Sequence, residues 1–311
     1  MPAPILHIGY HKTGTSWFQK NFFPHVRGAT YLDRRLVRDV FFNTTAFLFD
    51  AKRAAQRLAC KGRPIVSEED FSGFPDNSGC LEALSKDIAY RLHAVYPDAR
   101  IVIFIRNQLE MLRANYLQYA RGGGARSLEQ YLFPYDHEPH FAKRQHHKPL
   151  FTLEHFAYQH LIRHYRSVFG KDRVHVFLYE DFAAAPQAFA RAFAERFALD
   201  VPLDRLSYTR RNESLDTGAL KLARALGPFT TGTTRDRRLI LPLVPHWAHK
   251  AGMKVLNKTP LAGRRVTTSE LFGNELLIRL HNHYAAENRE LAREIDIDLK
   301  ARGYPVAPIE T

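Results

Sequence analysis

The segment Gly9–Trp17 combines glycine, lysine and hydroxyl side chains directly after an apolar stretch of strand length, Ile5–Ile8. The residues that follow, Phe18–Phe23, have helical character. A glycine-containing turn between a strand and a helix aims backbone N–H groups and the positive helix end at one point, which suits a phosphate or sulfate. Lys12 adds a mobile positive charge. The hydroxyl donors of the segment are Thr13, Thr15 and Ser16. We therefore predict an anion-binding loop here, with a threonine-rich turn that only caps a helix as the alternative.

The position of the lysine separates this loop from the common nucleotide-binding pattern G-x-x-x-x-G-K-[ST], in which lysine directly follows the second glycine. Here Lys12 precedes Gly14 by two residues. A magnesium-holding aspartate is also missing after the apolar stretch Ile101–Ile105, which runs into Arg106 instead. Phosphoryl transfer needs a cation to bridge phosphates, whereas sulfuryl transfer can be served by lysine and backbone dipoles. The pattern favours sulfuryl transfer.

Charged side chains also follow two other stretches of strand length. Arg106 ends one of them, and its planar guanidinium can hold a phosphate through two parallel hydrogen bonds. Pro64–Ser67 runs into the acids Glu68, Glu69 and Asp70. A carboxylate can take the proton that an acceptor hydroxyl loses as it attacks. The structural alternatives are an ion pair that closes the strand for the arginine and a solvated, helix-capping turn for the acids.

The run His11-Lys-Thr-Gly-Thr-Ser-Trp17 resembles the 5′-phosphosulfate loop of the sulfotransferases that use 3′-phosphoadenosine 5′-phosphosulfate (PAPS), commonly written K-[ST]-G-T-[ST]. The resemblance is to bacterial members that act on carbohydrates. It implies that Lys12 contacts the phosphosulfate bridge and stabilises the departing 3′,5′-ADP. The residues that it assigns to the donor in this loop are His11, Lys12, Thr13, Gly14, Thr15, Ser16 and Trp17.

The resemblance extends to the segment that binds the 3′-phosphate. It implies that Arg106 recognises this phosphate, the group that distinguishes PAPS from ATP. The family carries a serine eight residues after its arginine, but this chain has Ala114 there. Either Asn115 or a residue from elsewhere is expected to replace the contact. The segment Thr209–Ser214 resembles the N-x-S segment of bacterial members, which makes Arg211 a further candidate at this end of the donor, with surface ion pairing as the alternative.

Two other segments resemble the family. Ser67-Glu-Glu69 is similar to an S-x-E sequence of bacterial relatives, which implies that Glu69 is the general base, with Glu68 as the second candidate. Arg173–Phe182 resembles a strand followed by a Y-E-D turn and a helix. We expect Glu180 and Asp181 to fix that turn and the start of that helix.

Strand-like stretches alternate with segments of helical period, which predicts an α/β protein with a parallel sheet. The stretches are Ile5–Ile8, Pro64–Ser67, Arg100–Ile105 and Arg173–Tyr179. The resemblance implies the P-loop-like sulfotransferase fold, a three-layer α/β/α sandwich around a central parallel sheet. Ligands on such sheets collect at the carboxyl ends of the strands, so the loop, the arginine and the acids are expected to meet there.

The chain shows no glycine- or serine-rich linker, and we expect residues 1–311 to form a single domain. One region departs from the alternating pattern. Gly227–Arg265 is rich in basic residues and prolines, and it is expected to be a basic excursion or lid. Behind it, Leu271–Ile297 has the periodicity of a packed terminal helix.

The composition limits the classes of ligand and partner that the protein is expected to have. The chain has 311 residues and a formal net charge of +13, which favours anionic ligands. Two cysteines and the lack of an export signal lead us to expect a cytoplasmic location. No apolar run approaches the roughly 20 residues that cross a bilayer, which leaves only peripheral membrane contact open. The pair His160 and His164 lacks the glutamate of the H-E-x-x-H zinc motif, so no metal is expected. No nucleic-acid-binding motif is present, and nucleic acid is not an expected partner.

The sequence therefore leads to one hypothesis and two alternatives. The hypothesis is a PAPS-dependent sulfotransferase that moves the sulfuryl group directly, in line, to a hydroxyl of a small molecule or glycan, with a carbohydrate or glycolipid as the favoured acceptor class. It needs no covalent intermediate and no metal. The alternatives are a P-loop-type small-molecule kinase and a non-enzymatic module that binds anionic glycans or nucleic acid. The sequence does not define an oligomeric state.

Overall fold

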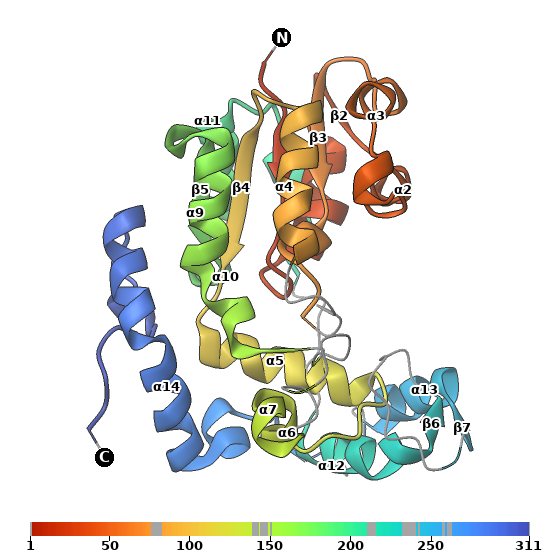
Figure 1. The fold of residues 1–311 in the computed structure, drawn as a ribbon, viewed down its shortest axis with the longest axis vertical. Coiled ribbons are helices and arrows are strands. Elements are labelled where there is room, and N and C mark those ends of the chain that lie inside the picture. The colour runs from red at the N-terminus through yellow and green to blue at the C-terminus, as the bar shows by residue number, and fades with distance from the viewer. Residues whose placement is uncertain are drawn as a thin grey trace.

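The computed structural model describes residues 2–75, 83–138, 151–209, 216–231, 243–256 and 263–310, together with Lys143, Pro149, Leu241 and Thr259. Its centre is a five-stranded parallel sheet with the strand order β2-β3-β1-β4-β5 (Figure 1). The strands are β1 (Ile5–His7), β2 (Ala29–Tyr31), β3 (Arg63–Ser67), β4 (Arg100–Ile105) and β5 (Val174–Leu178). The prediction of an α/β fold with a central parallel sheet is confirmed.

Four of these strands coincide with the predicted stretches to within a residue or two at each end. In β4 every residue after the first is buried, because helices cover both faces of the sheet. The sequence analysis missed β2. This strand has only three half-buried residues at the edge of the sheet, so it lacks an apolar run.

Among the described residues, thirteen α-helices surround the sheet. They are α1 (Thr15–Trp17), α2 (Arg34–Phe42), α3 (Ala51–Arg57), α4 (Ala83–Val95), α5 (Gln108–Arg121), α6 (Leu128–Leu132), α7 (Pro134–His137), α9 (Tyr158–Phe169), α10 (Tyr179–Ala184), α11 (Pro186–Phe197), α12 (Thr217–Leu226), α13 (His246–Leu256) and α14 (Thr268–Ile295). A short second pair of strands, β6 (Thr230–Thr231) and β7 (Val244–Pro245), lies beside α13.

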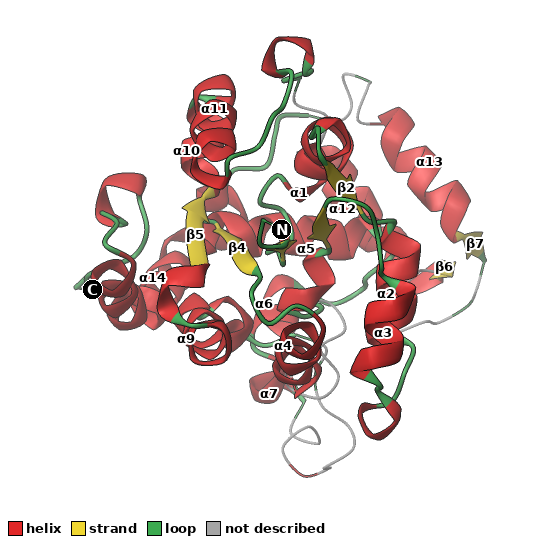
Figure 2. Cartoon of the chain, turned by 90° about the horizontal axis from the view of Figure 1, so that it is seen from above, coloured by secondary structure: helices red, strands yellow, loops and turns green. Residues whose placement is uncertain are grey.

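Each face of the sheet has its own apolar core. Figure 2 shows α4 and α9 on one side of the strands and α10 and α11 on the other. Alternate residues of a strand point to opposite faces, so Leu6 packs into the larger core with α4 and α9, while Ile5 packs into the smaller one. Phenylalanines dominate the smaller core: Phe18, Phe22, Phe23, Phe104, Phe182, Phe193 and Phe197. These two helix layers around the sheet make the predicted three-layer arrangement.

Helix α5 crosses beneath the carboxyl edge of the sheet, with α6, α7 and α12 below it (Figure 1). It begins two residues after β4, where the Asn107 side chain accepts hydrogen bonds from the N–H groups of Leu109 and Glu110. Helix α14 lies near one end of α5 and α13 near the other. Helix α5 therefore lies at the edge of the sheet where β4 ends (Figure 1).

The basic region Gly227–Arg265 contains β6, β7 and α13, and the rest of it falls partly outside the described residues. The predicted terminal helix corresponds to α14, which begins three residues earlier than expected and bends at Gly273, where φ is 66°. No helix in the described part of the chain is long and apolar enough to span a membrane.

The segment Tyr179-Glu-Asp181 holds the turn that follows β4. Glu180, in the first turn of α10, accepts hydrogen bonds from the Asn107 N–H at 2.9 Å and from the Tyr304 hydroxyl at 2.9 Å. Asp181 pairs with Arg302. Glu180 thus fixes the turn between β4 and α5 and ties it to the C-terminal segment, whereas the sequence led us to expect a role in its own turn.

Candidate active site

The three segments predicted to carry chemistry lie side by side, because β3, β1 and β4 are neighbours in the sheet. The loop after β1 touches both flanking segments. On one side a Cβ atom at Gly9, whose φ is 118°, would lie 2.8 Å from Ser72 Oγ and 3.0 Å from the Glu69 carbonyl oxygen, so only glycine fits. On the other side Arg106 Nη1 donates to the Lys12 carbonyl at 3.1 Å.

The loop itself is held in an unusual backbone conformation. Lys12 has a φ of 60°, the left-handed region that costs an ordinary residue about 1–2 kcal/mol. Gly14 has a φ of 88°, and a Cβ there would lie 2.9 Å from the ring of Phe182. Thr13 is fully buried, and its hydroxyl donates to the Tyr10 carbonyl at 2.5 Å. What Thr13 can offer an anion is therefore its backbone N–H.

The helical segment after the loop begins at Thr15 and continues through a π-helical turn, Phe18–Phe22. The N–H groups of Trp17 and Phe18 both donate to the Gly14 carbonyl. The first N–H groups of a helix have no partner within it, which leaves those of Thr15 and Ser16 for an anion. Ser16 and Lys12 are half-buried, whereas the Thr15 side chain is buried.

Trp17 anchors the segment that leads toward Arg211. Its indole Nε1 donates to the Ser207 carbonyl at 2.7 Å, and its ring stacks on Tyr208 with a centroid separation of 5.4 Å. Arg211 itself lies outside the described residues. Tyr208, which contacts Trp17 of the phosphate loop, is three residues before Arg211 in the sequence.

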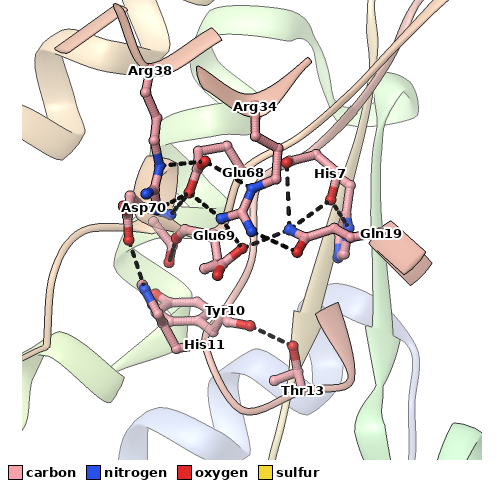
Figure 3. Close-up of polar contacts among 12 residues, drawn as sticks. His7, Tyr10, His11, Thr13, Gln19, Arg34, Arg38, Glu68, Glu69 and Asp70 are labelled. Atoms are coloured by element: carbon pink, nitrogen blue, oxygen red, sulfur yellow. Dashed lines mark hydrogen bonds and ion pairs between the residues drawn. The ribbon is translucent and has the colours of Figure 1, made fainter. Parts of the chain in front are cut away.

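The acidic segment after β3 is not a solvated turn. Glu68 is fully buried, and two arginines of α2 bind its carboxylate: Arg34 Nη2 lies 3.0 Å from Oε1, and Arg38 Nε lies 2.7 Å from Oε2 (Figure 3). The Glu68 side chain also accepts a hydrogen bond from the Asp70 N–H at 3.3 Å. A buried carboxylate with two guanidinium partners holds β3 and α2 together.

Glu69 differs from its neighbour, because its side chain keeps 16% of its surface exposed. Its carboxylate Oε2 lies 3.0 Å from Arg34 Nη2 and accepts a hydrogen bond from Gln19 Nε2 at 2.6 Å. Burial alone would raise the pKa of Glu69, but Arg34, His11 and the Gln19 amide outweigh it and hold this pKa below its ordinary value. Glu69 is therefore an ionised carboxylate at neutral pH.

Asp70 connects the acidic segment to the loop. His11 Nε2 and Asp70 Oδ1 are 2.8 Å apart, and Asp70 Oδ2 pairs with Arg38 at 2.6 Å (Figure 3). His11 was predicted as a donor-binding residue, and the structure places it against this carboxylate. The pair fixes the imidazole next to Lys12.

Three residues of this site were missed by the sequence analysis: Gln19, Arg34 and Arg38. Gln19 is buried, and its amide links Glu69, the Ser67 hydroxyl and Arg34. Arg34 and Arg38 are one helical turn apart, which puts both on one face of α2. A weak signal existed, since Asp33 is a good helix N-cap directly before them and accepts hydrogen bonds from the N–H groups of residues 35 and 36.

On the opposite flank, Arg106 is 9% exposed and lies beside the loop. Its Nη2 is 3.3 Å from Glu110 Oε2, and its guanidinium covers the ring of Tyr179 at 4.7 Å. Glu110 is shared, because it also pairs with Arg113 and accepts a hydrogen bond from Thr268. Arg106 therefore forms an ion pair through Nη2 while its Nη1 contacts the loop.

Asn115 lies in the middle of α5 and is fully buried. Its Nδ2 donates to the Met111 carbonyl at 3.0 Å, while its buried Oδ1 has no hydrogen-bond partner among the residues that the structure describes. The structure thus places Asn115 within α5, with its side chain fully buried.

No group of three or more potential metal ligands occurs in the parts of the chain that the structure covers. His160 and His164, one turn apart on α9, have separate partners. His160 pairs with Glu287 at 3.5 Å, and His164 contacts the Lys86 carbonyl at 3.1 Å.

A comparison with solved structures finds the crystal structure of a sulfotransferase from Alicyclobacillus acidocaldarius. It has 20% sequence identity and a TM-score of 0.49, over 73% of this chain and 93% of that chain. No protein-family model matches the sequence, and no curated protein matches it.

Proposed function

We propose that this protein is a PAPS-dependent sulfotransferase that transfers a sulfuryl group to a hydroxyl acceptor. The observation that carries the proposal is that the predicted anion-binding loop contacts both neighbouring segments, the one after β3 and the one after β4. Arg106 donates to the Lys12 carbonyl on one side, and on the other side Gly9 packs against the backbone of Glu69, the residue that carries the ionised carboxylate. A reaction between a polyanionic donor and a hydroxyl that must lose a proton needs this pair of environments.

The donor half of the site is the loop and the β4 flank. The N–H groups of Thr15 and Ser16 would bind the 5′-phosphate, together with the Ser16 hydroxyl. Lys12 would lie on the phosphosulfate bridge and neutralise the charge that develops on the leaving 3′,5′-ADP. Arg106 would hold the 3′-phosphate with its N–H groups in place of the Lys12 carbonyl. Arg211 and Asn115 remain candidates at this end of the donor.

The acceptor half is the β3 flank. Glu69 is proposed as the base because it is partly exposed, whereas Glu68 is fully buried and bound by two arginines. Gln19 and Arg34 would hold the Glu69 carboxylate in place while its free lone pairs accept the proton of the attacking hydroxyl. The sulfuryl group would then pass directly from donor oxygen to acceptor oxygen. A carbohydrate or glycolipid is the acceptor class that we propose.

Calorimetric titration with 3′,5′-ADP and with 5′-ADP, first without magnesium and then with it, tests the donor assignment. We expect metal-independent binding of 3′,5′-ADP with a clear preference over 5′-ADP. A preference for 5′-ADP that requires magnesium would contradict the proposal and indicate a kinase. The absence of binding for both nucleotides would indicate an anion-binding module without this donor.

A further inference from the structure

The region between Thr217 and Val266 accounts for most of the net positive charge of the chain. It contains ten lysines and arginines and one acid, Asp236, a net +9 out of the +13 of the whole protein. None of these residues belongs to the donor loop or to its flanks. A charge excess of this size, in a segment of the sequence that contributes no residue to the proposed active site, favours an anionic partner of its own.

Helix α13 shows how this charge is displayed. Its inner face is anchored by His249 and Met253, each 2% exposed, and His249 Nδ1 lies 3.1 Å from the Thr230 hydroxyl. The opposite face forms an exposed stripe at helical spacing. The residues of this stripe are Trp247, Lys250, Ala251, Lys254 and Val255.

Large apolar side chains are unusually exposed on and beside this stripe. Trp247 is 75% exposed and Val255 is 65% exposed. Both lie on the same helix as Lys250 and Lys254. Leu241 and Leu243, just before α13, are 52% and 67% exposed. We call the stripe together with Leu241 and Leu243, which come just before α13 in the chain, the α13 surface.

We propose that the α13 surface docks on an anionic lipid bilayer. Tryptophan and aliphatic side chains partition into the interface between headgroups and acyl chains, while lysines beside them pair with anionic headgroups. An acidic polysaccharide or a nucleic acid would pair with the same lysines, but it would have no use for exposed leucine and valine. The mixture of apolar and basic groups, with no acid among the described residues 217–231 and 243–256, therefore favours the lipid surface.

The α13 surface lies at the periphery of the molecule, on a helix that packs against α5 (Figure 2). Helix α13 packs against α5, which begins beside Arg106 and runs under the carboxyl edge of the sheet (Figure 1). In the view from above, α13 and the β6–β7 pair lie at the periphery of the molecule, with no other described helix outside them (Figure 2). A bilayer on this surface would approach the protein from the side of α5 on which α13 lies.

Co-sedimentation of the full-length protein with vesicles tests the proposal without any donor or acceptor, so its outcome is independent of the proposed function. The vesicles are pure phosphatidylcholine or phosphatidylcholine with about 30% phosphatidylglycerol, in about 0.1 M salt. We expect binding to the anionic vesicles only, and weaker binding as salt rises. Replacing Lys250 and Lys254 by glutamine should lower the partition coefficient about 25-fold, roughly fivefold per lysine.

The variant Trp247→Ala/Val255→Ala should lower binding about tenfold or more, because it removes the inserted side chains. Two controls are matched to these changes. The exposed lysines of Lys171→Gln/Lys300→Gln and the fully exposed aromatic ring of Phe47→Ala lie outside the α13 surface and should change binding less than about twofold. Trp247 is one of only two tryptophans, so the fluorescence blue shift on anionic vesicles should persist in Trp17→Phe and disappear in Trp247→Phe.

Several results would overturn the proposal. They are no sedimentation with anionic vesicles, equal binding to neutral vesicles, and equal losses in the control and α13 variants. Binding of heparin that exceeds vesicle binding and is unaffected by Trp247→Ala would assign the surface to an acidic glycan instead. Circular dichroism of each variant separates loss of binding from loss of folding.

Discussion

The two flanks of the phosphate loop carry opposite charge balances. On the β3 flank the carboxylates of Glu68, Glu69 and Asp70 outnumber the two arginines of α2 that bind them. On the β4 flank Arg106 and Arg113 both form an ion pair with the carboxylate of Glu110. The ion pairs of the β3 flank thus contain more carboxylates than arginines, whereas those of the β4 flank contain more arginines than carboxylates.

The difference suggests a division of labour. A phosphate is attracted to the β4 flank and repelled by the β3 flank, whereas a neutral hydroxyl can approach a carboxylate. The donor would therefore lie over the loop and Arg106, and the acceptor would enter beside Glu69. Under the proposed function the polarity across the loop orients both substrates before any chemistry occurs.

The sharpest test of the β3 flank compares its two neighbouring glutamates. Glu69→Gln should lower kcat about 100- to 10,000-fold with unchanged or slightly tighter binding of 3′,5′-ADP, because it removes the base and one negative charge. Glu68→Gln should instead lower the free energy of unfolding by about 1–3 kcal/mol, because Arg34 and Arg38 lose their shared buried partner and keep only Glu69 and Asp70. Steady-state kinetics and denaturant unfolding of both variants measure this. The reverse pattern would move the base to Glu68.

Lys12 tests the centre of the comparison. Lys12→Ala should lower kcat about 100-fold or more, because the charge on the leaving group is no longer neutralised. Its stability should change little, since alanine and lysine share the same left-handed backbone strain. Single-turnover kinetics and thermal denaturation check both parts, with the exposed Lys20→Ala of the same helical segment as the control. A loss of less than tenfold would remove Lys12 from the transition state.

Arg106 tests the β4 flank. Arg106→Ala should weaken binding of 3′,5′-ADP about 10- to 100-fold and leave binding of 5′-ADP nearly unchanged, because only the first nucleotide carries the 3′-phosphate. Calorimetry measures both affinities. Arg38→Ala on the β3 flank is the matched control and should not alter this selectivity. Equal weakening of both nucleotides by Arg106→Ala would show that the arginine has only a structural role.

The smallest expected effect concerns pH. The pKa of Glu69 lies below its ordinary value, so the carboxylate is ionised at neutral pH and is protonated only as pH falls into the acidic range. Arg34→Gln removes the strongest of the influences that lower this pKa, and the acidic limb of the kcat profile should move to higher pH. Arg35→Gln, at an exposed position of α2, is the control. An unchanged limb would mean that Glu69 does not govern it.

The sheet could be predicted where its strands are runs of β-branched and aromatic residues, as in β4. The loop could be predicted because its chemistry lies within consecutive residues. Arg34 and Arg38 could not be, because they meet Glu68 from positions 34 and 30 residues away, and only tertiary packing brings them together. The same holds for Asn115, whose sequence neighbourhood does not reveal that its side chain is fully buried. Local patterns thus located the loop, Arg106 and the acidic residues, but not the arginines of α2 that pair with those acids.

Gln19 gives the site a property that neither flank has alone. It belongs to the helical segment that continues the phosphate loop, yet its amide holds the Glu69 carboxylate and accepts a hydrogen bond from Arg34. Gln19 therefore connects the segment that would bind the donor to the carboxylate that would receive the proton. We expect the effects of substitutions in these two parts of the site not to be additive. In a double-mutant cycle, substitutions at positions 19 and 34 should show a non-zero interaction energy. An attempt to improve one half of this site by substitution will change the other half as well.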